Sequence, residues 1–151
     1  MNLFKKISGK SLTFLRLSGK RKILFAEAFF TSLMVKITLV FLPFRIVVKW
    51  LGSSKSEIIE SNVQTNTDVI KGIRFIIKMC DKNVPWKTEC YTNALTAKIM
   101  LKRRKLISTL YFGFCKDNSG KLIGHAWLKS SGIIVSGFCD FSNFQVHSVF
   151  S

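Results

Sequence analysis

Acidic residues are scarce in this sequence. Its 151 residues include 24 Lys and Arg against 8 Asp and Glu, which gives a formal net charge of +16. Such an excess suits a nucleic acid, an anionic membrane surface, or an acidic protein or peptide as a partner. No recognised nucleic-acid-binding motif is present, and the 14 Phe lie mostly in apolar runs instead of beside basic residues as stacking platforms. We therefore expect no nucleic-acid partner.

Closely spaced cysteines are also missing. The four cysteines stand at positions 80, 90, 115 and 139 and form no C-x-x-C pair, so the spacing of a zinc ribbon is absent. The N-terminal residues lack the clean apolar run and small-residue cleavage site of a secretory signal. We expect four reduced thiols in a bacterial cytoplasm, and neither a metal nor a cofactor.

Long uncharged runs are missing as well. Within the apolar residues 23–51, Lys36 and Arg45 interrupt the segment, and the uncharged runs 28–35 and 37–44 are eight residues each, whereas a membrane span needs about 20 apolar residues. Helical spacing of the apolar residues predicts an amphipathic helix that packs on the protein's own core, and the alternative is attachment to the anionic inner face of a membrane. The apolar stripe comprises Phe25, Phe29, Leu33, Ile37 and Val40.

The rest of the chain predicts an α+β fold. After the polar residues 52–67, apolar positions at helical spacing from Val69 to Cys80 predict an amphipathic helix, and another helix follows from about Glu89 to Arg104. Alternating apolar residues and turn residues then predict strands at 106–115, 121–129, 133–139 and 144–150. We divide the chain into an N-terminal apolar and basic helical region, 1–52, and a core, 66–151.

Histidines are few, so Cys–His chemistry has few candidates. Only His125 and His147 are present. Cys90 stands where a helix begins, and the backbone N–H groups and the dipole there favour a thiolate. His125 lies in the strand segment Gly124-His125-Ala126-Trp127, between small residues that leave one face of the imidazole open. A helix-borne Cys facing a strand-borne His predicts nucleophilic catalysis, although taken one by one a packing cysteine and a core histidine are the commoner explanations.

Residues 86–137 resemble the leader peptidase of lasso-peptide biosynthesis, a branch of the transglutaminase-like superfamily. The resemblance rests on Trp86 followed by the helix start Cys90-Tyr91-Thr92-Asn93-Ala94-Leu95, and on the later strand Gly124-His125-Ala126-Trp127-Leu128. It implies a papain/transglutaminase-like core, in which the nucleophile helix packs on antiparallel strands. It also implies hydrolysis of a peptide bond by a Cys-His-Asp triad, which frees the core of a ribosomally made precursor peptide from its leader.

The resemblance implies partners too. The chain is similar to the split type of this peptidase, which relies on a separate small recognition protein to hold the leader. An ATP-dependent cyclase related to asparagine synthetase then closes the lasso ring. The net charge of +16 suits an acidic leader or an acidic partner.

The acid of the triad is missing from its usual place in the sequence. In the family it usually lies about a dozen residues after the histidine, where this chain has Ser136 and Gly137. The nearest acid is Asp140, which we predict to orient His125, with Asn143 as the fallback. Two other functions stay open: acyl transfer by the same nucleophile, as in a true transglutaminase, and a non-catalytic basic protein that serves as a membrane-surface scaffold.

Overall fold

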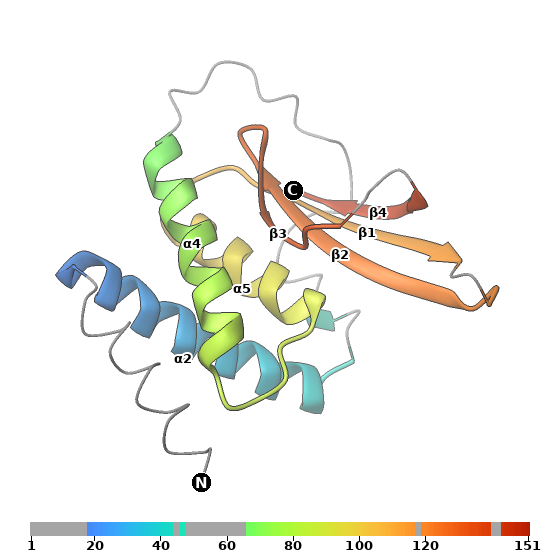
Figure 1. The fold of residues 1–151 in the computed structure, drawn as a ribbon, viewed down its shortest axis with the longest axis horizontal. Coiled ribbons are helices and arrows are strands. Elements are labelled where there is room, and N and C mark those ends of the chain that lie inside the picture. The colour runs from blue at the N-terminus through green and yellow to red at the C-terminus, as the bar shows by residue number, and fades with distance from the viewer. Residues whose placement is uncertain (1–17, 44–45, 48–65, 117–118, 140–142) are drawn as a thin grey trace, which may run out of the picture.

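The computed structural model describes residues 18–43, 46–47, 66–116, 119–139 and 143–151. Its elements follow the order α2 (Gly19–Phe41), α4 (Thr67–Asn83), α5 (Cys90–Arg103), β1 (Thr109–Lys116), β2 (Leu122–Ser130), β3 (Ile133–Ser136) and β4 (Gln145–Phe150) (Figure 1). The strands form one antiparallel sheet in the order β3-β2-β1-β4. The predicted α+β fold is confirmed. The predicted boundary between the two regions falls on residues outside the described part of the chain and stays a prediction.

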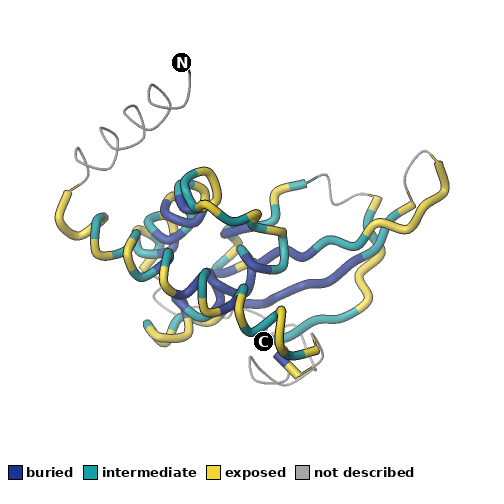
Figure 2. Tube along the Cα trace, turned by 90° about the horizontal axis from the view of Figure 1, so that it is seen from below, coloured by how far each residue is buried: buried dark blue, intermediate teal, exposed yellow. Residues whose placement is uncertain are grey.

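Helix α5 lies at the centre of the fold. It contacts α2 and α4 on one side and β2 and β3 on the other (Figure 1). Burial is concentrated where the helices meet the long strands (Figure 2). Eight of the 14 residues of α5 are buried, so this helix is held from several directions and can fix the position of a side chain at its first residue. The buried residues of α5 are Thr92, Ala94, Leu95, Thr96, Ala97, Lys98, Met100 and Leu101.

Lys98 is a charged side chain inside this core. Only 3% of its surface is exposed, and its ammonium donates to the backbone oxygens of Ser108 at 3.0 Å and Phe150 at 3.4 Å. Burial lowers the pKa of Lys98 to about 8. The two bonds tie α5 to the start of β1 and the end of β4.

Helix α2 packs differently from the prediction. Its buried residues are Ala28, Thr31, Ser32 and Val35, most of them small or polar. Ile37 and Val40, which the predicted stripe placed on the core, are 45% and 71% exposed. Apolar residues occur all around this helix, so small side chains that allow close helix packing decide which face is buried. The outward side carries large apolar side chains, namely Ile23, Phe30, Met34, Ile37, Val40 and Phe41.

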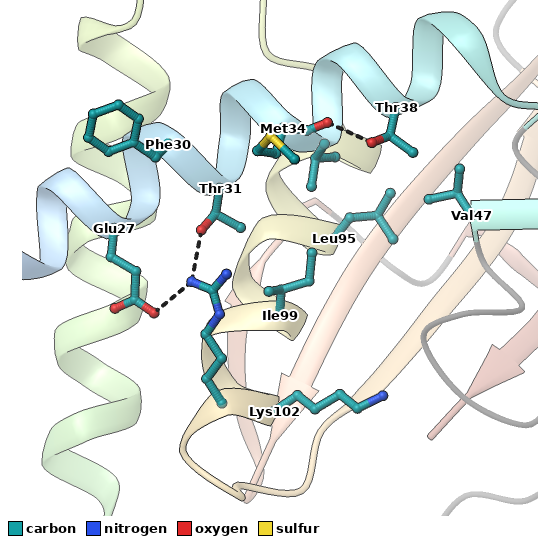
Figure 3. Close-up of a pocket in the computed structure, with 11 residues that line it drawn as sticks. Glu27, Phe30, Thr31, Met34, Thr38, Val47, Leu95, Ile99 and Lys102 are labelled. Atoms are coloured by element: carbon teal, nitrogen blue, oxygen red, sulfur yellow. Dashed lines mark hydrogen bonds and ion pairs between the residues drawn. The ribbon is translucent and has the colours of Figure 1, made fainter.

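An apolar groove of about 630 Å³ lies beside α2, lined by Phe30, Met34, Val47, Leu95 and Ile99 among others (Figure 3). By length and composition α2 could cross a membrane, although core helices of soluble proteins and signal sequences meet the same criterion. Attachment to a membrane surface and a cytoplasmic location stay predictions.

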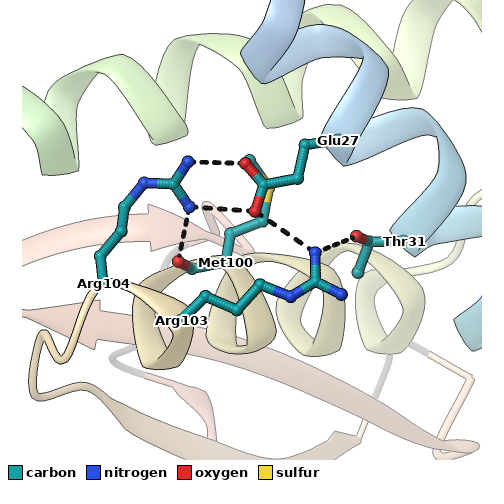
Figure 4. A network of polar contacts seen from close by, with 5 residues as sticks. All are labelled: Glu27, Thr31, Met100, Arg103 and Arg104. Carbon is teal, nitrogen blue, oxygen red and sulfur yellow. Dashed lines mark hydrogen bonds and ion pairs between the residues drawn. The ribbon is translucent and has the colours of Figure 1, made fainter.

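A charge cluster fastens α2 to the end of α5 (Figure 4). The guanidinium of Arg104 donates to both carboxylate oxygens of Glu27, at 3.0 and 2.6 Å, and Arg103 donates to one of them at 3.3 Å. The hydrogen bond from Arg104 is the largest cause that lowers the pKa of Glu27, and burial opposes it. Bidentate pairing of a guanidinium with a carboxylate restricts the direction in which α2 crosses α5.

Glu27→Gln is expected to lower the free energy of unfolding at pH 7 by about 1–2 kcal/mol, because the charge-assisted bonds to Arg104 are weakened. The folded-state pKa of Glu27 lies below the unfolded value, so this stabilisation is complete above pH 4.5 and is lost as the pH falls through the folded pKa. Urea denaturation at pH 7 and at about pH 3 measures both effects. The control is Glu89→Gln, since Glu89 forms only an exposed 3.8 Å ion pair with Lys36. Equal losses in the two variants would contradict this role for Glu27.

Candidate active site

Cys90 is the first residue of α5, and the segments on both sides of it are anchored. Asp81 of α4 accepts hydrogen bonds from the Thr88 hydroxyl and, at 2.9 Å, from the Asn93 amide. These bonds join the last turns of α4 to the residues just before and just after the cysteine. Trp86 donates its indole N–H to Ser32 of α2 at 3.2 Å. The start of α5 is therefore fixed by both neighbouring helices.

The thiol of Cys90 lies against strand β2. Burial is the largest influence on its pKa and raises it, while the backbone N–H groups of Ala126, Tyr91 and Cys90 itself act in the opposite direction. The sequence predicted that the helix start would favour the thiolate, and N–H groups at that helix start do so. Burial outweighs them, so the pKa ends above its ordinary value. A thiol in this position needs a base to become an effective nucleophile.

His125 lies in the middle of β2, opposite Gly113 of β1. Its half-buried ring contacts Trp127 and Phe144, with ring centroids at 6.3 and 5.5 Å, and these two rings also contact each other. The Nε2 atom is 3.2 Å from the backbone oxygen of Gly137, which directly follows β3. Two aromatic contacts and one polar contact thus restrict the rotation of the imidazole.

Cys90 and His125 line one pocket of about 470 Å³, which we call the Cys90 pocket. The thiol meets the backbone N–H of Ala126, the residue that follows His125 in β2. Thr88 and Asn93 also line the pocket, and so do Ser136, Gly137 and Phe138. The structure therefore brings together the two residues that the sequence selected as nucleophile and base.

The other candidates lie elsewhere or are not described. Asp140 falls within residues 140–142, outside the described part of the chain, so its assignment as the orienting acid stays a prediction. Asn143 is exposed. His147 is exposed on β4, where its ring contacts Phe114 at 5.6 Å, and it does not line the Cys90 pocket. Among the described residues, no three His, Cys, Asp or Glu side chains form a group that could hold a metal ion.

The remaining cysteines do not share the environment of Cys90. All four lie in the described part of the chain, and no disulfide joins any of them. Cys80 is buried in the core with its pKa raised to about 11, mainly by burial, and Cys115 and Cys139 are half-buried. None of these three lines the Cys90 pocket.

Two polar groups at the pocket were not predicted as site residues. The Gly137 carbonyl contacts His125, and the hydroxyl of Ser136, which is 3% exposed, has no hydrogen-bond partner. The sequence placed both residues near the usual position of the triad acid without assigning them a role. The one signal in the sequence was a glycine, Gly137, directly after a short strand, because glycine allows two main chains to approach each other closely.

Comparison with protein families agrees with this geometry. The model of the transglutaminase-like superfamily matches residues 38–149, which include α4, α5 and most of the sheet. The chain belongs to the transglutaminase-like superfamily. Its members are commonly cysteine hydrolases or acyltransferases. Searches of curated proteins and of solved structures give no match.

Proposed function

We propose that this protein is a cysteine peptidase that removes the leader from a ribosomally made precursor peptide in lasso-peptide maturation. One observation carries the proposal. A cysteine at the head of a helix and a histidine on the facing strand line the same pocket, in a chain of the transglutaminase-like superfamily. The resemblance of residues 86–137 to leader peptidases supplies the substrate class.

The reaction follows from the two side chains. His125 takes the proton of the Cys90 thiol, and the sulfur attacks the carbonyl carbon of the scissile peptide bond. As the C–N bond breaks, the imidazolium gives its proton to the leaving amine, which is the new N-terminus of the core peptide. The leader stays on Cys90 as a thioester. His125 then deprotonates a water molecule, which releases the leader as a carboxylic acid and restores the thiol.

The oxyanion of the tetrahedral intermediate needs hydrogen-bond donors. The backbone N–H groups at the start of α5 and the N–H of Ala126 already favour negative charge on the Cys90 sulfur. The oxyanion oxygen is two bonds from the sulfur, so the nearness of these donors supports a role for them in stabilising its charge.

The walls of the pocket bear on the choice of substrate. Lys78 and Lys82 of α4 line the pocket, and so does Phe138. The cationic groups of Lys78 and Arg74 lie over the Phe138 ring, at 4.1 and 4.4 Å from its centroid. This basic rim and the net charge of +16 support an acidic leader. A pocket of about 470 Å³ holds a ligand of roughly drug size, equivalent to a few residues. The rest of a leader must therefore bind to a surface outside this pocket.

That surface is proposed to belong to a separate recognition protein. When a second module holds the leader, the cleavage site meets Cys90 at roughly millimolar effective concentration. Cleavage of a precursor, followed by mass spectrometry, should therefore accelerate at least about tenfold when the recognition protein is added. An equal rate without it would refute the need for this partner, and no cleavage under either condition would refute the peptidase proposal. The cyclase related to asparagine synthetase would act afterwards on the freed N-terminus.

Acyl transfer is the second candidate, because it shares every step up to the thioester. The acceptor alone differs, an amine instead of water. Supplying a primary amine together with the precursor separates the two reactions, since a transferase yields the leader amide in preference to the leader acid.

A further inference from the structure

We propose that the backbone carbonyl of Gly137 orients His125, so that the base is held by a neutral main-chain acceptor. This inference rests on the proposed function, in which His125 activates Cys90. The Gly137 oxygen lies 3.2 Å from Nε2 of His125. A carbonyl oxygen can only accept a hydrogen bond, so Nε2 must carry the hydrogen. The lone pair of the neutral ring is then on Nδ1, the one ring atom able to receive the thiol proton.

The position of the carbonyl is set by a close crossing of two backbones. Gly137 has φ +75°, and a Cβ added there would lie 2.2 Å from the Ala126 oxygen and 2.7 Å from the Trp127 Cα. Both of these atoms belong to main chain, so no side-chain movement could relieve the contact. Glycine therefore lets the segment after β3 cross directly over β2 at the two residues that follow His125.

Gly132 provides a matched comparison within the same fold. It has nearly the same backbone angle, φ +73°, but nothing lies within 4 Å of a Cβ added there. It occupies the turn between β2 and β3. The requirement for glycine at 132 is therefore conformational alone, whereas position 137 adds the close approach that aims the carbonyl at His125.

A neutral acceptor can perform one of the two roles of a triad acid. It fixes the tautomer and the ring orientation, which is the positioning role. It lacks the negative charge with which a carboxylate stabilises an imidazolium. Among the described residues, the charged side chains that line the pocket are Lys78, Asp81 and Lys82 of α4, and Glu89 precedes Cys90. Asp81 already accepts hydrogen bonds from Thr88 and Asn93.

Nitrogen-15 NMR of the imidazoles tests the proposal on the full chain without any substrate. There are two histidines, and His125→Gln assigns the signals. At a pH at which the imidazoles are neutral, we expect His125 to show a slowly exchanging Nε2–H and an unprotonated Nδ1. A hydrogen on Nδ1 would overturn the proposal. So would loss of the Nε2–H signal in Asp140→Asn, because the carboxylate would then be the group that holds the ring.

Thiol reactivity gives a second readout. The rate of alkylation at Cys90 by iodoacetamide, mapped by peptide mass, should fall at least about tenfold in Gly137→Ala, since a misoriented base no longer assists the thiol. Gly132→Ala is the control and should stay within about twofold. An unchanged rate in a folded Gly137→Ala would contradict the proposal. If that variant does not fold, the NMR result on the wild-type chain still decides. Failure of the wild-type chain to cleave a precursor would refute the peptidase function and leave the tautomer measurement valid.

Discussion

Cys90→Ala is expected to lower the rate of precursor cleavage by at least about 10³-fold while the fold is retained. The side chain is half-buried, and it supplies the atom to which the acyl group is transferred, so no neighbouring group can replace it. His125→Ala should cause a loss of similar size, because a nucleophile and its base act as one unit. Cleavage is measured by mass spectrometry with precursor and recognition protein present.

The other three cysteines are the matched controls for this prediction. Cys115→Ala and Cys139→Ala should retain full activity, because neither side chain lines the Cys90 pocket. Cys80→Ser should lower stability, since it places a hydroxyl in the buried core, but it should leave the rate per folded molecule unchanged. Full activity in Cys90→Ala, or loss of activity only in one of the controls, would remove the basis for the proposed mechanism.

Removal of residues 1–52 is expected to abolish soluble, folded protein. Helix α2 buries Ala28 and Val35 in the core, and Leu24, Phe25 and Leu39 pack against it. Full burial of a large apolar side chain contributes about 1.5–3 kcal/mol, and the partly buried ones contribute a fraction of it. Together they approach the net stability of a whole domain, which is about 5–15 kcal/mol. The truncated chain would also lose the pairing of Glu27 with Arg104 and expose an apolar surface on α4 and α5.

Soluble yield, near-ultraviolet circular dichroism and sedimentation velocity measure this effect. A chain that starts at Ser18 is the control, since it keeps all of α2. If the chain that starts at Ser53 is monomeric, folded and active, α2 is not part of the core. Its outward apolar residues would then serve another purpose, of which contact with a membrane surface is the first to test.

The amphipathic pattern of α4 could be read correctly from sequence, and that of α2 could not. In α4, Ile70, Ile73, Ile76, Ile77 and Cys80 are all buried, as their spacing predicted. In α2 large apolar residues occur on every side, so periodicity alone does not identify the packed face. The pairing of Glu27 with arginines more than 70 residues away, and the close packing allowed by Ala28 and Ser32, decide it. Both depend on tertiary structure that a local pattern does not contain.

The site divides in the same way. Cys90 and His125 could be selected because a helix start and a rare histidine leave a signal in the sequence, and the resemblance of residues 86–137 to leader peptidases implied their catalytic roles. The Gly137 carbonyl could not, because every residue has one and only the fold determines which carbonyl meets the imidazole. Asp140, which the sequence predicted for the same role, is the alternative to this carbonyl that the Asp140→Asn variant tests.

The central claim is that the leader is carried on Cys90 as a thioester, and trapping with hydroxylamine tests it most directly. Hydroxylamine attacks a thioester and converts the released leader into its hydroxamate, which mass spectrometry distinguishes from the free acid. With precursor and recognition protein present, the wild-type chain should yield leader hydroxamate in proportion to the hydroxylamine added, and Cys90→Ala should yield none. Release of the leader only as the free acid, or formation of the hydroxamate by Cys90→Ala, would contradict the account.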